Sequence, residues 1–121
     1  MTEIFVDPTK QSISVRVESQ SLHIVGFEIN VYAADGNTVL ETFTGDTKTN
    51  PFIKSLSKKP SDYAGGYISG TFKVIEPNGK DFTYTLEFSI VIEDAIIHPD
   101  NTLSGITRNG IAKVVSTFHL N

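Results

Sequence analysis

The segment DFTYTLEFSIVIE, residues 81–93, decides the fold class of this chain. Its even-numbered positions are all apolar: Phe82, Tyr84, Leu86, Phe88, Ile90 and Ile92. Its odd-numbered positions are polar except for Val91. Successive side chains of a β-strand point to opposite faces, whereas a helix would mix these two sets on every side. The segment therefore predicts a long β-strand with one apolar face and one polar face.

A second alternating segment precedes this strand and keeps the same even phase. Its inward positions are Ile68, Gly70, Phe72 and Val74. Between the two segments stands EPNGK, residues 76–80, whose proline, asparagine and glycine suit a three-residue hairpin loop. We expect one hairpin, with Val74 opposite Phe82 and Phe72 opposite Tyr84. The second strand outruns the first, and long strands tend to bend between sheets or to wrap a barrel.

Length and composition narrow the class of protein. A chain of 121 residues is expected to form one domain, spanning residues 1–121. Its core is expected to be large enough to be stable without disulfides or bound metal ions. It contains no cysteine, and its formal net charge of −4 argues against nonspecific binding of nucleic acid. No apolar run reaches the length of a membrane span. The first residues lack a signal-peptide pattern, so we expect a cytoplasmic protein or an exported one whose leader is absent from this chain, and the compartment stays unknown.

Alternation elsewhere predicts further strands, at residues 13–17 and 112–120. Leu22 and Ile24 start in even phase, but the apolar positions of residues 27–33 are odd. One extra residue beside a glycine would produce this shift as a β-bulge, and two consecutive strands would also explain it. The segment ADGN, residues 34–37, predicts a second hairpin turn. A two-residue turn pairs Val31 with Leu40, a three-residue loop pairs Val31 with Val39, and we favour the first.

Residues 45–66 form the longest stretch without a strand pattern. Asn50 followed by Pro51 suits a helix start, and Phe52, Ile53 and Leu56 would then share one face. We expect one or two helical turns that end before residue 60. Long loops of compact domains are often functional, which makes this segment a candidate binding region. Further turns are predicted at HPDN, residues 98–101, and at NG, residues 109–110.

These elements together predict an all-β, single-domain antiparallel β-sandwich of about 8 strands with one short helical turn. A closed antiparallel β-barrel is the alternative. The segment SDYAGGY, residues 61–67, resembles the corner that leads into a late strand of immunoglobulin-like domains. The resemblance implies an immunoglobulin-like architecture and identifies no particular family.

The sequence offers little that marks catalysis or metal binding. The histidines, His23, His98 and His119, have no spacing that makes a ready pair of metal ligands. The densest polar cluster has oxygens of the kind that bind calcium, in Glu93, Asp94, His98, Asp100 and Asn101. It lacks the calcium-loop pattern, and a solvated turn is the favoured interpretation. With no nucleophile motif and no phosphate loop, we expect no catalytic residue, metal or cofactor, and a protein that is not an enzyme.

Two surfaces are candidate binding sites. Lys54, Lys58 and Lys59 form the one basic cluster of the sequence, beside Phe52 and Tyr63. The polar turn at residues 98–101 is the second candidate. The expected binding residues are therefore Phe52, Lys58, Lys59, Tyr63, His98, Asp100 and Asn101. The polar face of the central hairpin is neutral and rich in serine and threonine, and it suits another sheet, a glycan or a sister subunit: Ser69, Thr71, Thr83, Thr85 and Ser89.

The favoured function is a non-catalytic binding or assembly module that acts through loops and sheet edges. Its partner would be a protein or a glycan, and edge pairing would give a homo-oligomer. Neither nucleic acid nor a membrane span is expected. The alternative is a small-molecule carrier with a barrel cavity lined by Phe72, Phe82, Tyr84 and Phe88. A void behind Tyr84 would favour the carrier, and close packing there would favour the module. A small enzyme is the third possibility, favoured only by a carboxylate or histidine with a shifted pKa in a cleft.

Overall fold

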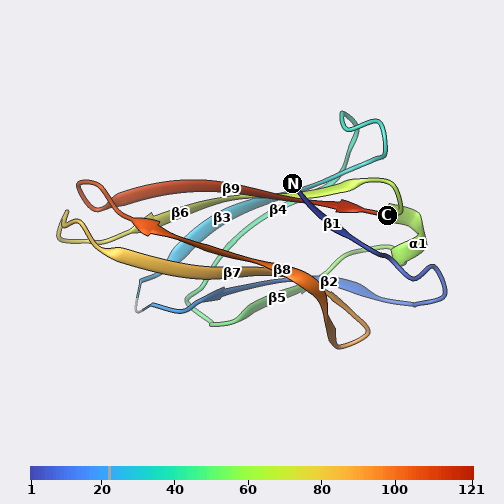
Figure 1. Cartoon of the computed structure of the whole chain (residues 1–121), viewed down its shortest axis with the longest axis horizontal. Coiled ribbons are helices and arrows are strands. Elements are labelled where there is room, and N and C mark those ends of the chain that lie inside the picture. The colour runs from blue at the N-terminus through green and yellow to red at the C-terminus, as the bar shows by residue number, and fades with distance from the viewer. Residues whose placement is uncertain (22) are drawn as a thin grey trace.

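The computed structural model describes residues 1–21 and 23–121 (Figure 1). Within these residues the chain forms nine strands and one short helix. In chain order they are β1 (Thr2–Ile4), β2 (Ile13–Ser19), β3 (Val25–Tyr32), β4 (Val39–Asp46), β5 (Phe52–Ser55), α1 (Pro60–Tyr63), β6 (Tyr67–Ile75), β7 (Thr83–Ile92), β8 (Ala95–Ile106) and β9 (Ile111–Leu120). The strands alternate buried and exposed residues, as a sheet with one face against a core requires.

The strands build two sheets that pack face to face, visible as the two layers of Figure 1. One sheet has the order β1-β9-β6-β3-β4, and the other has the order β5-β2-β7-β8. Neighbouring strands are antiparallel except for β1, which runs parallel to β9. The predicted antiparallel β-sandwich is confirmed. The alternative closed barrel is wrong, because each sheet of the described chain ends in two edge strands and does not close on itself.

Phenylalanine rings from both sheets fill the centre of the sandwich. Phe72 on β6 meets Phe88 on β7 edge-to-face, with 5.1 Å between ring centroids. Phe88 meets Phe118 on β9 in the same way at 5.0 Å. All three rings are fully buried, and Phe27 on β3 extends the group at 6.0 Å from Phe72. Edge-to-face pairs add to the stability that burial itself supplies, so these contacts hold the two sheets together.

The expected hairpin between β6 and β7 is wrong, because the two strands lie in opposite sheets. β6 pairs with β3 and β9, whereas β7 pairs with β2 and β8. Phe72 therefore lies opposite Phe27 and Val114 in its own sheet and not opposite Tyr84. Alternation identifies the buried face of each strand, and that part of the expectation holds for both. Alternation does not identify the neighbouring strand. The apolar face of a strand is buried equally well whether the next strand of the chain pairs with it in the same sheet or lies across the sandwich in the other sheet.

The loop between β6 and β7 is closed by Glu76, which explains why its turn residues do not make a hairpin. The Glu76 carboxylate accepts hydrogen bonds from the backbone N–H groups of Asn78 and Lys80, at 3.1 and 2.6 Å. The turn is thus completed inside the loop, and the chain is free to cross to the other sheet. Phe82, expected on the buried face, lies before β7 and is half exposed.

The expected helix at residues 51–56 is wrong, because residues 52–55 form strand β5 along the free edge of β2. Asn50 does not cap a helix. Its side-chain amide donates to the backbone oxygen of Ser19 at 2.8 Å and accepts from the backbone N–H of Ser19 at 3.0 Å. This pair of bonds imitates one step of a β-ladder and sets the register of β5. The one helical turn comes later, at α1, where Pro60 occupies the first turn.

The turn expected at residues 98–101 is also wrong, because these residues belong to β8. The chain reverses earlier, at Glu93 and Asp94, whose positive φ angles of 47° and 68° suit a two-residue hairpin turn. β8 bulges at residues 98–100, opposite Ser89 of β7. Because β8 is an edge strand, Pro99 removes no ladder hydrogen bond from an inner strand. The turn predicted at residues 109–110 is confirmed, with Arg108 bridged to Ile111.

Two register expectations are corrected near β3. The strand begins at Val25, which is buried, so the phase shift marks the start of β3 and not a bulge. Ile24 lies outside the strand, and Leu22 falls outside the described residues. In the hairpin with β4, Tyr32 pairs with Val39, but a bulge then places Val31 opposite Glu41. Neither expected partner of Val31, Leu40 or Val39, is therefore found.

The single serine- and threonine-rich face expected from the hairpin does not exist. Ser69 and Thr71 lie on the outer face of one sheet, Thr83 and Thr85 lie on the other sheet, and Ser89 is buried. In the corner that resembles immunoglobulin-like domains, Tyr63 is the buried tyrosine, and Tyr67 stacks on His119 at 4.7 Å. The immunoglobulin-like architecture stays a prediction. Among the described residues, no helix has the length and apolar character needed to cross a bilayer.

Truncation of the central rings tests this core. Phe72→Ala or Phe88→Ala is expected to lower the free energy of unfolding by about 3–5 kcal/mol, because each ring is removed from a packed interior. Urea denaturation followed by circular dichroism measures the change. Val115→Ala on the exposed face of β9 is the control, with a change within about 0.5 kcal/mol. A comparable loss in all three variants would contradict the assigned core.

Candidate functional site

The structure places the expected binding residues of the 45–66 segment in different roles. Phe52 on β5 is half buried, with its ring 4.8 Å from that of Phe27, so it covers the edge of the core. Tyr63 is buried, and its hydroxyl accepts from the backbone N–H of Lys58 at 3.0 Å and donates to Glu41. Burial and this bond to Glu41 raise the pKa of Tyr63. Tyr63 therefore joins α1 to β4 and is not available to a partner, while Lys58 and Lys59 are exposed.

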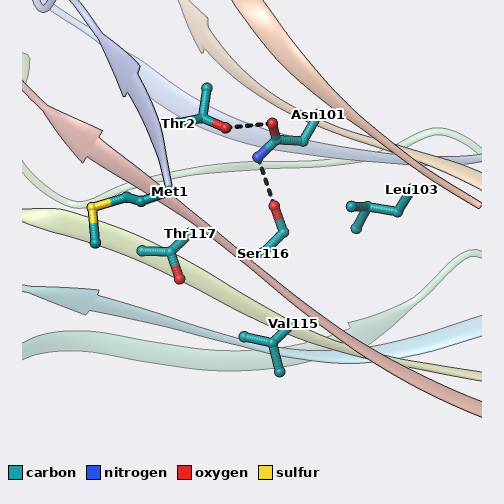
Figure 2. A pocket seen from close by; sticks show the side chains of 7 residues that line it. All are labelled: Met1, Thr2, Asn101, Leu103, Val115, Ser116 and Thr117. Atoms are coloured by element: carbon teal, nitrogen blue, oxygen red, sulfur yellow. Dashed lines mark hydrogen bonds between the residues drawn. The ribbon is translucent and has the colours of Figure 1, made fainter.

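The expected binding residues of β8 lie at the opposite edge of the same sheet, whose order is β5-β2-β7-β8. The structure thus does not bring the two groups of residues together. Asn101 links three strands: its side chain accepts from the Thr2 hydroxyl and donates to Ser116, both at 2.6 Å (Figure 2). These bonds border a shallow hollow of about 290 Å³ between β1, β8 and β9. Asn101 therefore has a structural role in closing this side of the sandwich.

A carboxyl pair lies on the outer face of the β5-β2-β7-β8 sheet, at the bulge of β8. Its hydrogen bond to Asp100 raises the pKa of Glu87, and the same contact lowers the pKa of Asp100. The exposed His98 imidazole lies 3.6 Å from the Asp100 carboxylate. Glu93, from the polar cluster of residues 93–101, forms an ion pair with Lys10 and accepts a hydrogen bond from the backbone N–H of Gln11. In the chain as described, no group of three or more histidine and acidic side chains is arranged to hold a metal ion.

A large hollow with an apolar lining lies elsewhere, at the end of the sandwich where β3 begins and β6 ends. We call it the end groove, and it has a volume of about 940 Å³. The start of β3 and the end of β6 lie on the left in Figure 1. It is lined by Ser21, His23, Ile24, Gly26, Asp46, Lys73, Ile75, Glu76, Pro77 and Phe82. A volume of this size is typical of sites for small molecules, which are concave and mostly apolar.

Exposed apolar side chains form the walls of the end groove. Ile24, Ile75 and Phe82 keep 48%, 48% and 49% of their surface open to solvent. Gly26 leaves the floor of the groove open, because a β-carbon at this position would meet no atom within 4 Å. Single exposed apolar residues are common, but three around one hollow mark a surface suited to a partner or ligand.

Buried hydrogen bonds hold the loop that carries Phe82. The fully buried Thr107 hydroxyl accepts from the backbone N–H of Phe82 and donates to the backbone oxygen of Lys80, both at 2.8 Å. The Glu76 backbone N–H donates to the oxygen of Gly110 at 2.8 Å. The imidazole of His23 then packs on the Phe82 ring, with 4.4 Å between centroids. Contacts within the protein therefore hold this wall of the groove in place.

The polar groups of the end groove are mostly committed to its own backbone. Bonds from the backbone of Lys80 and from Asn78 lower the pKa of Glu76. The Asp46 carboxylate accepts from the backbone N–H of Lys48 at 2.9 Å. Nδ1 of His23 is buried and has no hydrogen-bond partner among the described residues. The groove thus offers mainly apolar surface, and the ammonium of Lys73 on its lining belongs to none of the ion pairs found in the described chain.

Sequence reasoning missed this site, although two signals point to it. Ile75 is apolar on the outward parity of β6, and Ile24 is out of phase with β3. Alternation alone places Ile24 at the start of a strand and assigns no role to Ile75. Comparison with known proteins adds no relative: no family model, no curated protein and no solved structure matches the chain.

The loop of the end groove gives a pH prediction. Because the folded-state pKa of Glu76 is depressed, its ionised form stabilises the fold above the ordinary glutamate pKa, and this contribution is lost as the pH falls through the depressed value. Glu76→Gln is therefore expected to unfold at lower urea concentration than the parent protein at neutral pH. At about pH 3 the difference should shrink. An equal difference at both pH values would contradict the assigned role.

Proposed function

We propose that the protein is a non-catalytic binding module that takes an apolar ligand in the end groove. The observation that carries the proposal is the set of three half-exposed apolar side chains around a hollow of about 940 Å³. Burial of such surface is worth about 25 cal/mol per Å², which makes apolar contact the main source of affinity there. The proposal keeps the binding module with an immunoglobulin-like architecture that the sequence predicts. It places the binding surface in the end groove and not in the 45–66 segment or at residues 98–101.

Preorganisation supports binding at this end. The loop of Phe82 is fixed by Thr107, and Gly26 leaves the floor open, so among the described residues a ligand need not order this loop or displace a side chain from the floor. Sites of this kind lose little of their affinity to conformational entropy. The groove's carboxylates accept bonds from their own loops, which supports binding over chemistry.

The carrier with a central cavity has less support. Phe72 and Phe88 fill the core in contact with each other and do not line a cavity. Tyr84 is buried against Gly105, where a β-carbon would lie 2.7 Å from its hydroxyl oxygen. This is close packing, and it favours the module.

Self-assembly through a sheet edge is a second candidate function. β4 is an eight-residue edge strand on which Val39 and Leu40 are exposed. Open edges of this length are able to pair with a second copy. The other edges are less suited, because β1 and β5 are short and β8 carries a bulge and Pro99. Light scattering over a concentration series tests this candidate, and a monomer at all concentrations would count against it.

Binding of Nile red, a neutral apolar dye, tests the end groove. The native protein is expected to raise the dye's fluorescence with saturation. Ile75→Lys should weaken binding about tenfold or more, because it removes roughly 1.5–3 kcal/mol of apolar contact. Ile53→Lys, at an equally exposed isoleucine on β5, is the matched control and should bind as the parent does. No binding by the native protein, or an equal loss in the control, would contradict the proposal.

A further inference from the structure

Two lysines lie side by side at the mouth of the end groove. Lys73 on β6 lines it, and Lys113 on β9 is its direct partner in the antiparallel ladder, on the same outer face. Like charges directly opposite each other on a sheet are destabilising. Every ion pair found among the described residues involves other groups, so neither ammonium is neutralised by a carboxylate within 4 Å. The pair is thus a small uncompensated positive site.

In the described part of the chain, the acidic residues of the groove form no ion pair with Lys73 or Lys113 within 4 Å. Asp46 lies beyond Gly26 in the same row of the sheet, two strands from Lys73. Its carboxylate accepts from the backbone of Lys48, and that of Glu76 accepts from the backbone of its own loop. Both carboxylates keep their negative charge, so the positive site is limited to the Lys73 and Lys113 pair, on a chain whose formal net charge is −4.

The open floor connects the lysines to the apolar walls. Gly26 is the neighbour of Lys73 on β3, and nothing lies within 4 Å of the position a β-carbon would take there. Ile75 is the next outward residue after Lys73 on β6, and Ile24 precedes β3 beside it. A ligand with its polar head beside Lys73 would therefore place its apolar tail over Ile75 and Ile24, towards Phe82.

We infer that the end groove selects a monomeric amphipathic acid, a molecule with one carboxylate and an unbranched apolar tail. The carboxylate lies at Lys73 and Lys113, and the tail lies along Ile75, Ile24 and Phe82. This inference rests on the proposed function and names the ligand class of the same groove. Since the net charge of the protein repels anions, a preference for the acid must come from the local lysines.

Three ligands of equal chain length test the inference: dodecanoic acid, dodecanol and dodecylamine, each used below its critical micelle concentration as a competitor of Nile red. At low ionic strength the acid is expected to bind about three- to tenfold more tightly than the alcohol, which is the range for two exposed charge contacts. In about 1 M sodium chloride, where the Debye length is about 3 Å, this ratio should approach one.

Charge-matched variants locate the preference. The double variant Lys73→Gln, Lys113→Gln should bind acid and alcohol equally, with each competition referred to the variant's own measured affinity for Nile red. The control is Lys54→Gln, Lys58→Gln, which removes the same charge from β5 and the loop before α1 and should keep the preference for the acid.

The contrary outcomes separate the inference from the proposed function. Equal binding of acid and alcohol by the native protein, or tighter binding of the amine, would overturn the inference while leaving the groove as a binding site. Failure of Nile red and of all three ligands would overturn both. Binding to phosphatidylserine vesicles without binding of the free acid would also overturn the inference, because it would make a lipid surface the ligand.

Discussion

The contact between Phe72 and Phe88 is the interaction on which the rest of the molecule depends. Each ring belongs to a different sheet, and together with Phe118 and Phe27 they form a continuous aromatic group through the core. Their packing fixes how the two sheets lie on each other. Most of the loops join one sheet to the other, so their positions follow from this contact.

The end groove is a consequence of that crossing. The chain leaves one sheet after Ile75 and enters the other at Thr83, and the seven residues between must span the gap. Thr107 and Glu76 satisfy the backbone groups of this span, which leaves Phe82 on the outside of the core. An apolar side chain held at the surface leaves apolar area in water, and a ligand or partner that covers this area would gain the free energy of its burial. This is the physical reason for regarding the groove as functional.

Local sequence patterns predicted the features that depend on neighbouring residues in the chain. Alternation identified the buried faces of β2, β6, β7 and β9, and with them the sandwich class. It failed where the outcome depends on distant residues. Residues 52–55 became a strand because β2 offers a free edge, and Asn50 pairs with Ser19 of that edge instead of capping a helix. The turn residues 76–80 were recognised, but their loop crosses between sheets.

The same limit applies to the site. The end groove draws its lining from residues 21, 23, 24, 26, 46, 73, 75–77 and 82, and no single segment carries its pattern. The expected binding residues were chosen because they lie in segments without strand pattern. The structure shows that one of them, Tyr63, is buried, and that Asn101 joins three strands. Irregular sequence and surface function are therefore not equivalent in this chain.

Nuclear magnetic resonance titration of the isotopically labelled protein with dodecanoic acid tests the account most directly. The account predicts saturable shifts of the backbone amides of Gly26, Lys73, Ile75 and Phe82, with little change in β5 and in residues 98–101. Shifts concentrated at Phe52–Ser55 or at residues 98–101 would show that binding occurs at another surface. The absence of any saturable shift would contradict the end groove as a ligand site.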